Sequence, residues 1–188
     1  MITKYKIIAL FGPAGSGKDY IQKAVMKTIW GKTHFNEIIS CTTRPPREGE
    51  IDGVHYHFIP YEKDFMQKEK IEYTRFRNWY YGTPFNSLDI QKINIGVFNI
   101  NGIYQILNKD EVQCLPIYIK TSPKIRLLRQ LQRENEPDCN EIVRRYLTDE
   151  KDFLNIPFHY HVIENNYDEI QPIISEILSL SRAMDKIN

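Results

Sequence analysis

A glycine-rich turn near the start of the chain has the residue types and spacing of a phosphate-binding loop. Phe11–Asp19 reads Phe-Gly-Pro-Ala-Gly-Ser-Gly-Lys-Asp and contains the pattern Gly-x-x-x-x-Gly-Lys. In such a P-loop, backbone amides converge on phosphate oxygens, the next helix adds its positive end, and the lysine reaches the outer phosphates. The pattern therefore predicts phosphate binding. A serine or threonine that contacts Mg²⁺ usually follows the lysine, whereas this chain has Asp19.

The elements around this loop predict an α/β fold. The apolar run Tyr5–Phe11 is typical of a buried parallel strand, and helical spacing of apolar residues follows from Lys18 to about Trp30. Residues 54–59 alternate, which predicts an exposed antiparallel strand. Strands alternating with helices indicate a parallel sheet in a three-layer arrangement. Further strands are expected at 38–42, 95–100, 115–119 and 160–163, and further helices at 61–69, 102–108, 123–133, 141–153 and 170–184.

The composition is that of an ordinary globular protein. The 188 residues carry a net charge of +1, which argues against a general binder of nucleic acids or membranes. No apolar run approaches the roughly 20 residues that span a bilayer, and Met1 leads almost directly into a strand, so no signal peptide is expected. Cys41, Cys114 and Cys139 fit neither a disulfide framework nor a zinc site, which favours a cytoplasmic location.

Motifs beyond the P-loop resemble those of the guanylate kinase family. Ser40–Glu50, Asp52–Phe58, Ile71–Tyr73 and Tyr80–Pro84 occur in the family order and with nearly the family spacing, and the resemblance covers essentially the whole chain. It implies a single domain with a P-loop nucleoside-triphosphate-hydrolase-like fold, an inserted NMP-binding subdomain and a helical lid. The core would comprise about 1–35, 91–122 and 154–188, the NMP-binding subdomain about 36–90, and the lid about 123–153.

The resemblance also implies the two substrates, ATP and a nucleoside monophosphate, with Mg²⁺ as the cofactor. Its ATP-binding positions are Gly12, Pro13, Ala14, Gly15, Ser16, Gly17, Lys18, Asp19 and, less distinctively, Asn165, where a loop of the family meets adenine. Lid arginines of the family match Arg133 and Arg145, which would neutralise phosphate charge in the transition state together with Lys18 and Arg44. Arg129 and Arg144 are also compatible with a solvated helix surface.

The monophosphate-binding positions of the family match Arg44, Arg47, Tyr56 and Tyr81. Guanidinium groups and tyrosine hydroxyls suit a phosphate dianion, because several charge-assisted donors can converge on its oxygens.

Recognition of the base would rest on Glu72, with Ser40 and Thr83. A carboxylate can accept hydrogen bonds from N1–H and the amino group of guanine, whereas adenine has no N1–H, and the two hydroxyls could donate to O6.

Two departures from the family pattern bear on the metal. Asp19 replaces the P-loop hydroxyl, and the segment Asn99–Asn101 carries asparagines where the family carries aspartates. We therefore expect Asp19 to supply a carboxylate linked to Mg²⁺, directly or through water.

The favoured interpretation is ATP-dependent phosphorylation of GMP or dGMP. One alternative is a related kinase that acts on another nucleoside monophosphate or a phosphorylated sugar, which the asparagines make credible. A more distant alternative is a protein-binding module without catalysis; such modules usually lose the P-loop and the lid arginines, whereas this chain keeps Lys18, Arg133 and Arg145. The sequence leaves open whether the protein is a monomer or a dimer.

Overall fold

The computed structural model describes residues 4–47, 49–133, 135–166 and 169–185, so Glu48, inside the Ser40–Glu50 motif, lies outside the described residues. Five parallel strands form the central sheet, in the order β2-β7-β1-β8-β9. Their bounds are Tyr5–Phe11 for β1, Phe35–Glu37 for β2, Ile93–Val97 for β7, Val112–Lys120 for β8 and His161–Glu164 for β9.

The middle strand, β1, is apolar because both faces of the sheet are covered. All side chains from Ile7 to Phe11 are fully buried. Since side chains alternate across a strand, Ile8 and Leu10 pack into one hydrophobic cluster, and Ile7, Ala9 and Phe11 pack into another on the opposite face. The predicted buried parallel strand is therefore confirmed.

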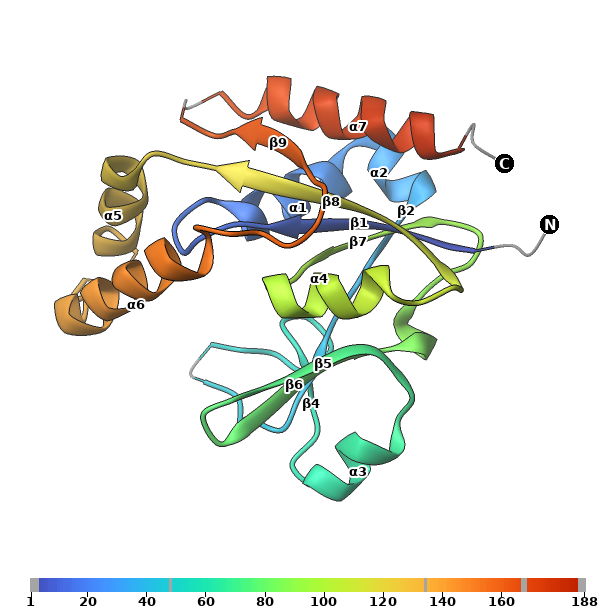
Figure 1. Ribbon diagram of the computed structural model, residues 1–188, viewed down its shortest axis with the longest axis horizontal. Coiled ribbons are helices and arrows are strands. Elements are labelled where there is room, and N and C mark those ends of the chain that lie inside the picture. Colours follow the sequence, from blue (N-terminus) through green and yellow to red (C-terminus); the bar gives the residue numbers. More distant parts are fainter. Residues whose placement is uncertain (1–3, 48, 134, 167–168, 186–188) are drawn as a thin grey trace.

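Helices cover the two faces of this sheet in a three-layer α/β arrangement (Figure 1). On one face lie α1 (Lys18–Lys27), α2 (Ile29–His34) and α7 (Gln171–Asp185), and on the other lies α4 (Ile100–Leu107). Apolar residues of α1 and α7 complete the first cluster, and Ile103 and Ile106 of α4 complete the second. Among the helices of the described residues, none has both the length and the apolar character that crossing a membrane requires.

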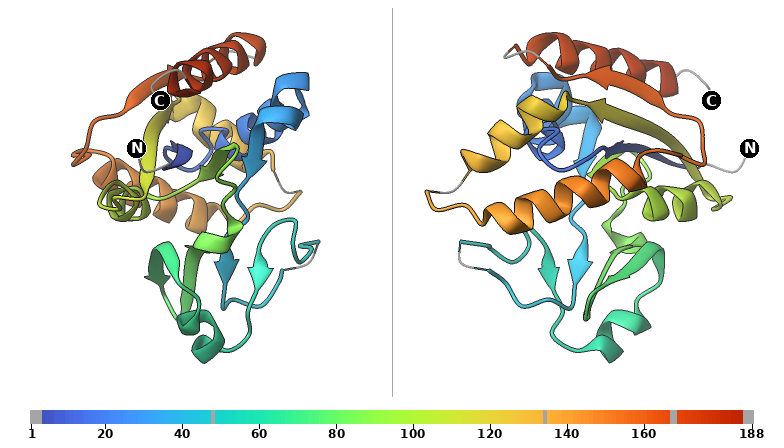
Figure 2. Two further views of the ribbon diagram at one scale, coloured as in Figure 1. Left: turned by 90° about the vertical axis from the view of Figure 1, so that its right-hand side faces the viewer. Right: turned by 60° about the vertical axis from the view of Figure 1, so that its left-hand side comes forward.

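A second, smaller sheet lies beyond α4, away from the central sheet (Figures 1 and 2). Its strand order is β4-β3-β6-β5. The backbone of Tyr73 in β5 is joined to α4 by the side chain of Gln105, which accepts from the amide at 3.0 Å and donates to the carbonyl at 2.8 Å. The strands are β3 (Cys41–Thr42), β4 (His57–Phe58), β5 (Lys70–Phe76) and β6 (Trp79–Pro84), accompanied by α3 (Glu62–Gln67) and the 3-10 turn Phe85–Ser87.

Two helices, α5 (Pro123–Leu131) and α6 (Cys139–Asp152), project from the carboxyl end of the central sheet (Figure 2). Asp138 caps α6, because its carboxylate accepts a hydrogen bond from the Glu141 amide at 3.0 Å. These helices occupy the segment expected to form the lid.

Three expectations for individual elements are wrong. The helix after the P-loop does not continue to Trp30, because Thr28 adopts an extended conformation with ψ 158° and its hydroxyl caps α2 by accepting from the Gly31 amide at 2.8 Å. The strand expected at 38–42 is replaced by β2, which ends at Glu37, and by β3 in the second sheet. In the range 54–59, only His57–Phe58 is a strand, because a turn around Gly53 (φ +74°) precedes it. This short strand pairs parallel with β3, not antiparallel as expected.

Candidate active site

The P-loop connects β1 to α1 in a conformation that needs glycine. Gly15 and Gly17 have φ of +77° and +91°, and a Cβ on Gly15 would lie 2.5 Å from the backbone oxygen of Arg126. Lys18 folds over the loop, where its Nζ donates to the carbonyls of Gly12 at 2.7 Å and Pro13 at 3.0 Å. Burial lowers the pKa of the Lys18 ammonium, although the nearby carboxylates of Asp19 and Asp149 oppose that shift.

Asn165 lies beneath this loop and is almost fully buried. Its Nδ2 donates to the carbonyl of Ser16 at 2.8 Å, and the Thr121 hydroxyl donates to the same carbonyl at 3.1 Å. Arg129 donates to the Asn165 carbonyl at 3.5 Å. The structure thus gives Asn165 a role in holding the loop, and its contact with adenine stays a prediction. Thr121 belongs to no sequence motif, so its role in holding the P-loop could not have been predicted from the sequence.

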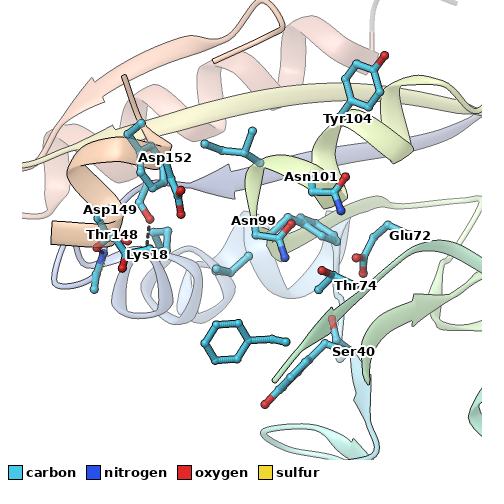
Figure 3. A pocket seen from close by; sticks show the side chains of 18 of the residues that line it. Lys18, Ser40, Glu72, Thr74, Asn99, Asn101, Tyr104, Thr148, Asp149 and Asp152 are labelled. Atoms are coloured by element: carbon cyan, nitrogen blue, oxygen red, sulfur yellow. Dashed lines mark hydrogen bonds between the residues drawn. The ribbon is translucent and has the colours of Figure 1, made fainter. Parts of the chain in front are cut away.

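A cavity of about 1090 Å³ extends from the P-loop to the second sheet, between α4 and α6 (Figure 3). Lys18 and Asp149 lie at one end, and Glu72 and Ser40 lie at the other. The carboxyl ends of β1 and β7 open into this region, which is where α/β folds with parallel sheets usually bind ligands. The structure therefore brings the P-loop lysine and two of the predicted base-recognition residues, Glu72 and Ser40, to a single cavity, whereas the third, Thr83, is fully buried and does not line it.

Glu72 is buried at the base-recognition end. Its exposed fraction is 6 %, and it pairs across strands with Thr83, whose hydroxyl donates to Glu72 Oε1 at 2.7 Å. The Ser40 hydroxyl lies 3.0 Å from that of Thr83, so the three predicted residues form one hydrogen-bonded chain. Burial raises the pKa of the Glu72 carboxyl to about 7, and the hydrogen bonds from Thr83 limit the shift.

The start of α4 forms the wall opposite Glu72. Asn99 caps this helix by accepting a hydrogen bond from the Gly102 amide at 2.7 Å. A Cβ on Gly102 would lie 3.0 Å from Glu72 Oε2, so glycine at this position leaves space for the carboxylate. Asn99 and Asn101 both line the cavity (Figure 3).

Arg44 follows β3 of the second sheet, and its side chain is fixed by an ion pair. Its guanidinium donates to both carboxylate oxygens of Glu50, at 2.9 Å and 2.8 Å, and lies 5.6 Å from the ring centre of Tyr56. The hydrogen bond from Arg44 lowers the pKa of Glu50 to about 2. The Tyr56 ring meets Tyr81 edge-on at 5.9 Å. No role was assigned to Glu50 from the sequence, although its spacing of six residues from Arg44 in one short loop was a usable signal.

A second cavity of about 730 Å³ adjoins the first, and the predicted site residues that line both are Ala14, Lys18, Ser40, Tyr56, Tyr81 and Arg145. Its other lining residues from the predicted site are Gly15, Gly17, Asp19, Arg44, Arg47 and Arg133. The predicted phosphate-binding side chains of the P-loop, the second sheet and the lid therefore surround two connected spaces.

Three arginines of the segment predicted to form the lid approach the cavities from α6 and the chain just before it. Arg145 lines both cavities and donates to Glu141 at 2.8 Å, and Arg144 lines the first and donates to the same carboxylate at 2.6 Å. Arg133 lines the second cavity and is exposed. Arg133 and Arg145 are thus placed where a bound polyphosphate could meet them, because both line the cavity that also contains the P-loop lysine and Arg44.

Asp19 is the predicted metal-linked residue, and it lies exposed in the first turn of α1 beside Lys18. Across the described ranges, no three His, Cys, Asp or Glu residues converge closely enough to hold a metal ion by themselves. Mg²⁺ commonly needs only one or two carboxylates, because phosphate oxygens and water complete its octahedron. The Asp19 carboxylate therefore fits a metal that enters together with a nucleotide.

Besides Glu50, two further charged residues of the site went unrecognised in the sequence. Asp149 of α6 accepts a hydrogen bond from the P-loop amide of Ala14 at 2.6 Å, and Arg126 of α5 donates to the Ala14 carbonyl at 3.2 Å. Asp149 is four residues after Arg145 and so shares its helix face, which was the available signal.

Comparisons with known proteins agree with this geometry. The family model described as "Guanylate kinase" matches residues 4–181. A protein named "Guanylate kinase" from Helicobacter pylori (strain ATCC 700392 / 26695) is 31% identical over 188 residues, covering 94% of this chain and 88% of the relative. One of the same name from Mycoplasma mycoides is 32% identical over 195 residues, covering 98% and 64%. The crystal structure of guanylate kinase from Anaplasma phagocytophilum has a TM-score of 0.67 at 18% identity, with coverage of 97% and 87%, which shows a shared fold.

Proposed function

The chain belongs to the guanylate kinase family, and we propose that it catalyses transfer of the terminal phosphoryl group of ATP to GMP or dGMP. The observation that carries this proposal is the cavity lined by both Lys18 and Glu72. A P-loop alone accounts for binding of one nucleotide, whereas a buried carboxylate in the same cavity provides a place for a purine base.

On the donor side, the amides of the P-loop and the Lys18 ammonium bind the phosphates of ATP. Lys18 Nζ donates to the carbonyls of Gly12 at 2.7 Å and Pro13 at 3.0 Å. These two hydrogen bonds would be exchanged for hydrogen bonds to phosphate oxygens when ATP binds. Bound Mg²⁺ would supply positive charge to the phosphates, and Asp19 is the residue that would hold it or its water. Arg133 and Arg145 balance the remaining charge from the lid.

On the acceptor side, Arg44, Arg47, Tyr56 and Tyr81 bind the monophosphate. Arg44 keeps its guanidinium fixed through Glu50, so little side-chain entropy is lost when the phosphate arrives. The attacking phosphate oxygen is already ionised and requires no general base. Catalysis therefore rests on positioning and charge stabilisation.

Base choice rests on the chain of hydrogen bonds from Ser40 through Thr83 to Glu72. An ionised Glu72 can accept from N1–H and the amino group of guanine. Adenine has neither N1–H nor an amino group at C2, so it would leave the buried carboxylate without both donors, which is costly in a dry site. We also infer a cytoplasmic location, because Cys41, Cys114 and Cys139 are all free.

A coupled assay of ADP release tests the proposal. With ATP and Mg²⁺, release should depend on added GMP or dGMP, and Lys18→Ala should abolish it. Faster ADP release with another nucleoside monophosphate or a phosphorylated sugar would contradict the proposed acceptor. GMP binding without ADP release would favour a non-catalytic binding module instead.

A further inference from the structure

The lid helix α6 places a carboxylate directly on the P-loop. Asp149 Oδ2 accepts a hydrogen bond from the Ala14 amide at 2.6 Å, although the two residues are 135 positions apart. Ala14 is the third residue of the Gly12–Lys18 loop, whose amides are the natural donors to phosphate oxygens. Asp149 and Lys18 lie close together at the same end of the cavity (Figure 3).

Arg126 fixes this carboxylate from the other side. The Arg126 side chain is only 4% exposed, and its Nε donates to the Ala14 carbonyl at 3.2 Å. Its Nη2 lies 3.5 Å from Asp149 Oδ2, and its Nη1 donates to Glu150 at 3.0 Å. One buried guanidinium thus links the P-loop, α5 and α6.

A phosphate oxygen and the Asp149 carboxylate would compete for the same donor. Both are anions, and two anions placed at one amide repel each other strongly where the surroundings are poorly hydrated. A nucleotide phosphate that uses the Ala14 amide must therefore move Asp149 away from it. Arg126 is already within 3.5 Å and can keep Asp149 as a partner after that exchange.

We propose that Asp149 is a residue of the ATP site that sets the affinity for phosphate, by holding the Ala14 amide until a phosphate oxygen replaces its carboxylate. This proposal rests on the proposed function only in taking the P-loop as the ATP site; it does not depend on which acceptor is phosphorylated. It predicts that removing the carboxylate strengthens nucleotide binding, a gain that misfolding cannot imitate.

The test is the dissociation constant for a non-hydrolysable ATP analogue, measured by calorimetry on the full chain with Mg²⁺. Asp149→Ala should bind about tenfold more tightly than the wild type, a gain of about 1.4 kcal/mol. Asp149→Asn keeps the shape of the side chain and removes its charge, so its dissociation constant should lie between those of the wild type and Asp149→Ala. Asp152→Asn removes a carboxylate that lines the same cavity three residues further along α6, and it should change the constant less than twofold.

Two ligands that each contain only part of the nucleotide show whether the gain in affinity comes from the phosphates or from the nucleoside. Inorganic tripolyphosphate should show the same gain in Asp149→Ala, whereas adenosine, which has no phosphate, should bind the variant and the wild type equally. Unchanged or weaker binding of the ATP analogue by Asp149→Ala and Asp149→Asn would overturn the proposal, as would an equal gain in Asp152→Asn. A wild type that binds the ATP analogue but phosphorylates no guanine nucleotide would contradict the proposed function and leave this test valid.

Discussion

At the scale of single residues, recognition of guanine depends most on the ionisation of Glu72. This carboxylate accepts one hydrogen bond from Thr83 and would have to accept two more from guanine, which only the ionised form can do. Because burial raises its pKa to about 7, a neutral solution contains a mixture of both forms. Guanine recognition should therefore be sensitive to pH in the physiological range.

We expect kcat/KM for GMP to fall about tenfold for each pH unit below the Glu72 pKa of about 7, since this ratio reports groups of the free enzyme. Glu72→Gln should lower kcat/KM for GMP at all pH values and lose most of this dependence. The slope that remains in the variant belongs to the substrate, whose phosphate titrates near pH ~6. A wild-type profile that matches that of the variant would rule out Glu72 as the titrating group.

The same pKa predicts how stability changes with pH. The folded protein keeps Glu72 protonated up to about pH 7, whereas the unfolded chain ionises it near 4.5. Between these values the folded state binds more protons, so this group makes the free energy of unfolding decrease as the pH rises. Urea unfolding of the wild type and Glu72→Gln at several pH values checks this sign: from about pH 4.5 to 7 the wild type should lose stability relative to the variant as the pH rises.

At the scale of elements, we expect α6 to contribute to catalysis and the break between α1 and α2 to contribute to stability. In α6, Arg144 and Arg145 share the Glu141 carboxylate, but Arg145 lines both cavities and Arg144 lines one. Arg145→Ala should therefore lower kcat by at least about 100-fold, as expected for an arginine that neutralises transition-state charge. Arg144→Ala is the matched control and should lower kcat much less. Equal losses in the two variants would show that the helix, rather than one arginine, was affected.

The break between α1 and α2 should matter for stability and leave the chemistry unchanged. Thr28→Ala removes the cap of α2 and should reduce the free energy of unfolding by about 1 kcal/mol. The control is Thr33→Ala in α2, because Thr33 is exposed and its hydroxyl contacts only groups of its own helix, namely two carbonyls and the Nδ1 of His34; that change should stay within about 0.5 kcal/mol. Denaturant unfolding measures both, and a larger effect of Thr33→Ala would contradict the assignment of the cap.

Elements with strong local patterns could be predicted from the sequence. The run from Ile7 to Phe11 and the following P-loop are local features, and the order of strands and helices fixed the fold class. Strand β2 could not be predicted, because Phe35–Glu37 is only three residues long and contains a single apolar side chain. The break at Thr28 depends on one hydroxyl and leaves the apolar spacing intact, so periodicity predicted one continuous helix.

At the scale of the whole molecule, the site joins three parts of the chain that are far apart in the sequence. The motifs predicted which side chains would take part, and the structure brings Ser40, Glu72 and Thr83 into one hydrogen-bonded chain. The contact of Asp149 with Ala14 spans 135 residues and follows from the packing of α6 on the P-loop, which no local pattern encodes. The roles of the individual site residues remain predictions for mutagenesis.

The central claim is that the enzyme selects a guanine monophosphate as its acceptor. The most direct measurement is a competition in which ATP labelled in its terminal phosphate is supplied with equal concentrations of GMP, AMP, CMP and UMP, and the labelled products are separated. We expect nearly all transferred label to appear in GDP, and Glu72→Gln to lose most of this preference. Predominant label in ADP, CDP or UDP, or a preference for GDP that Glu72→Gln leaves intact, would contradict it.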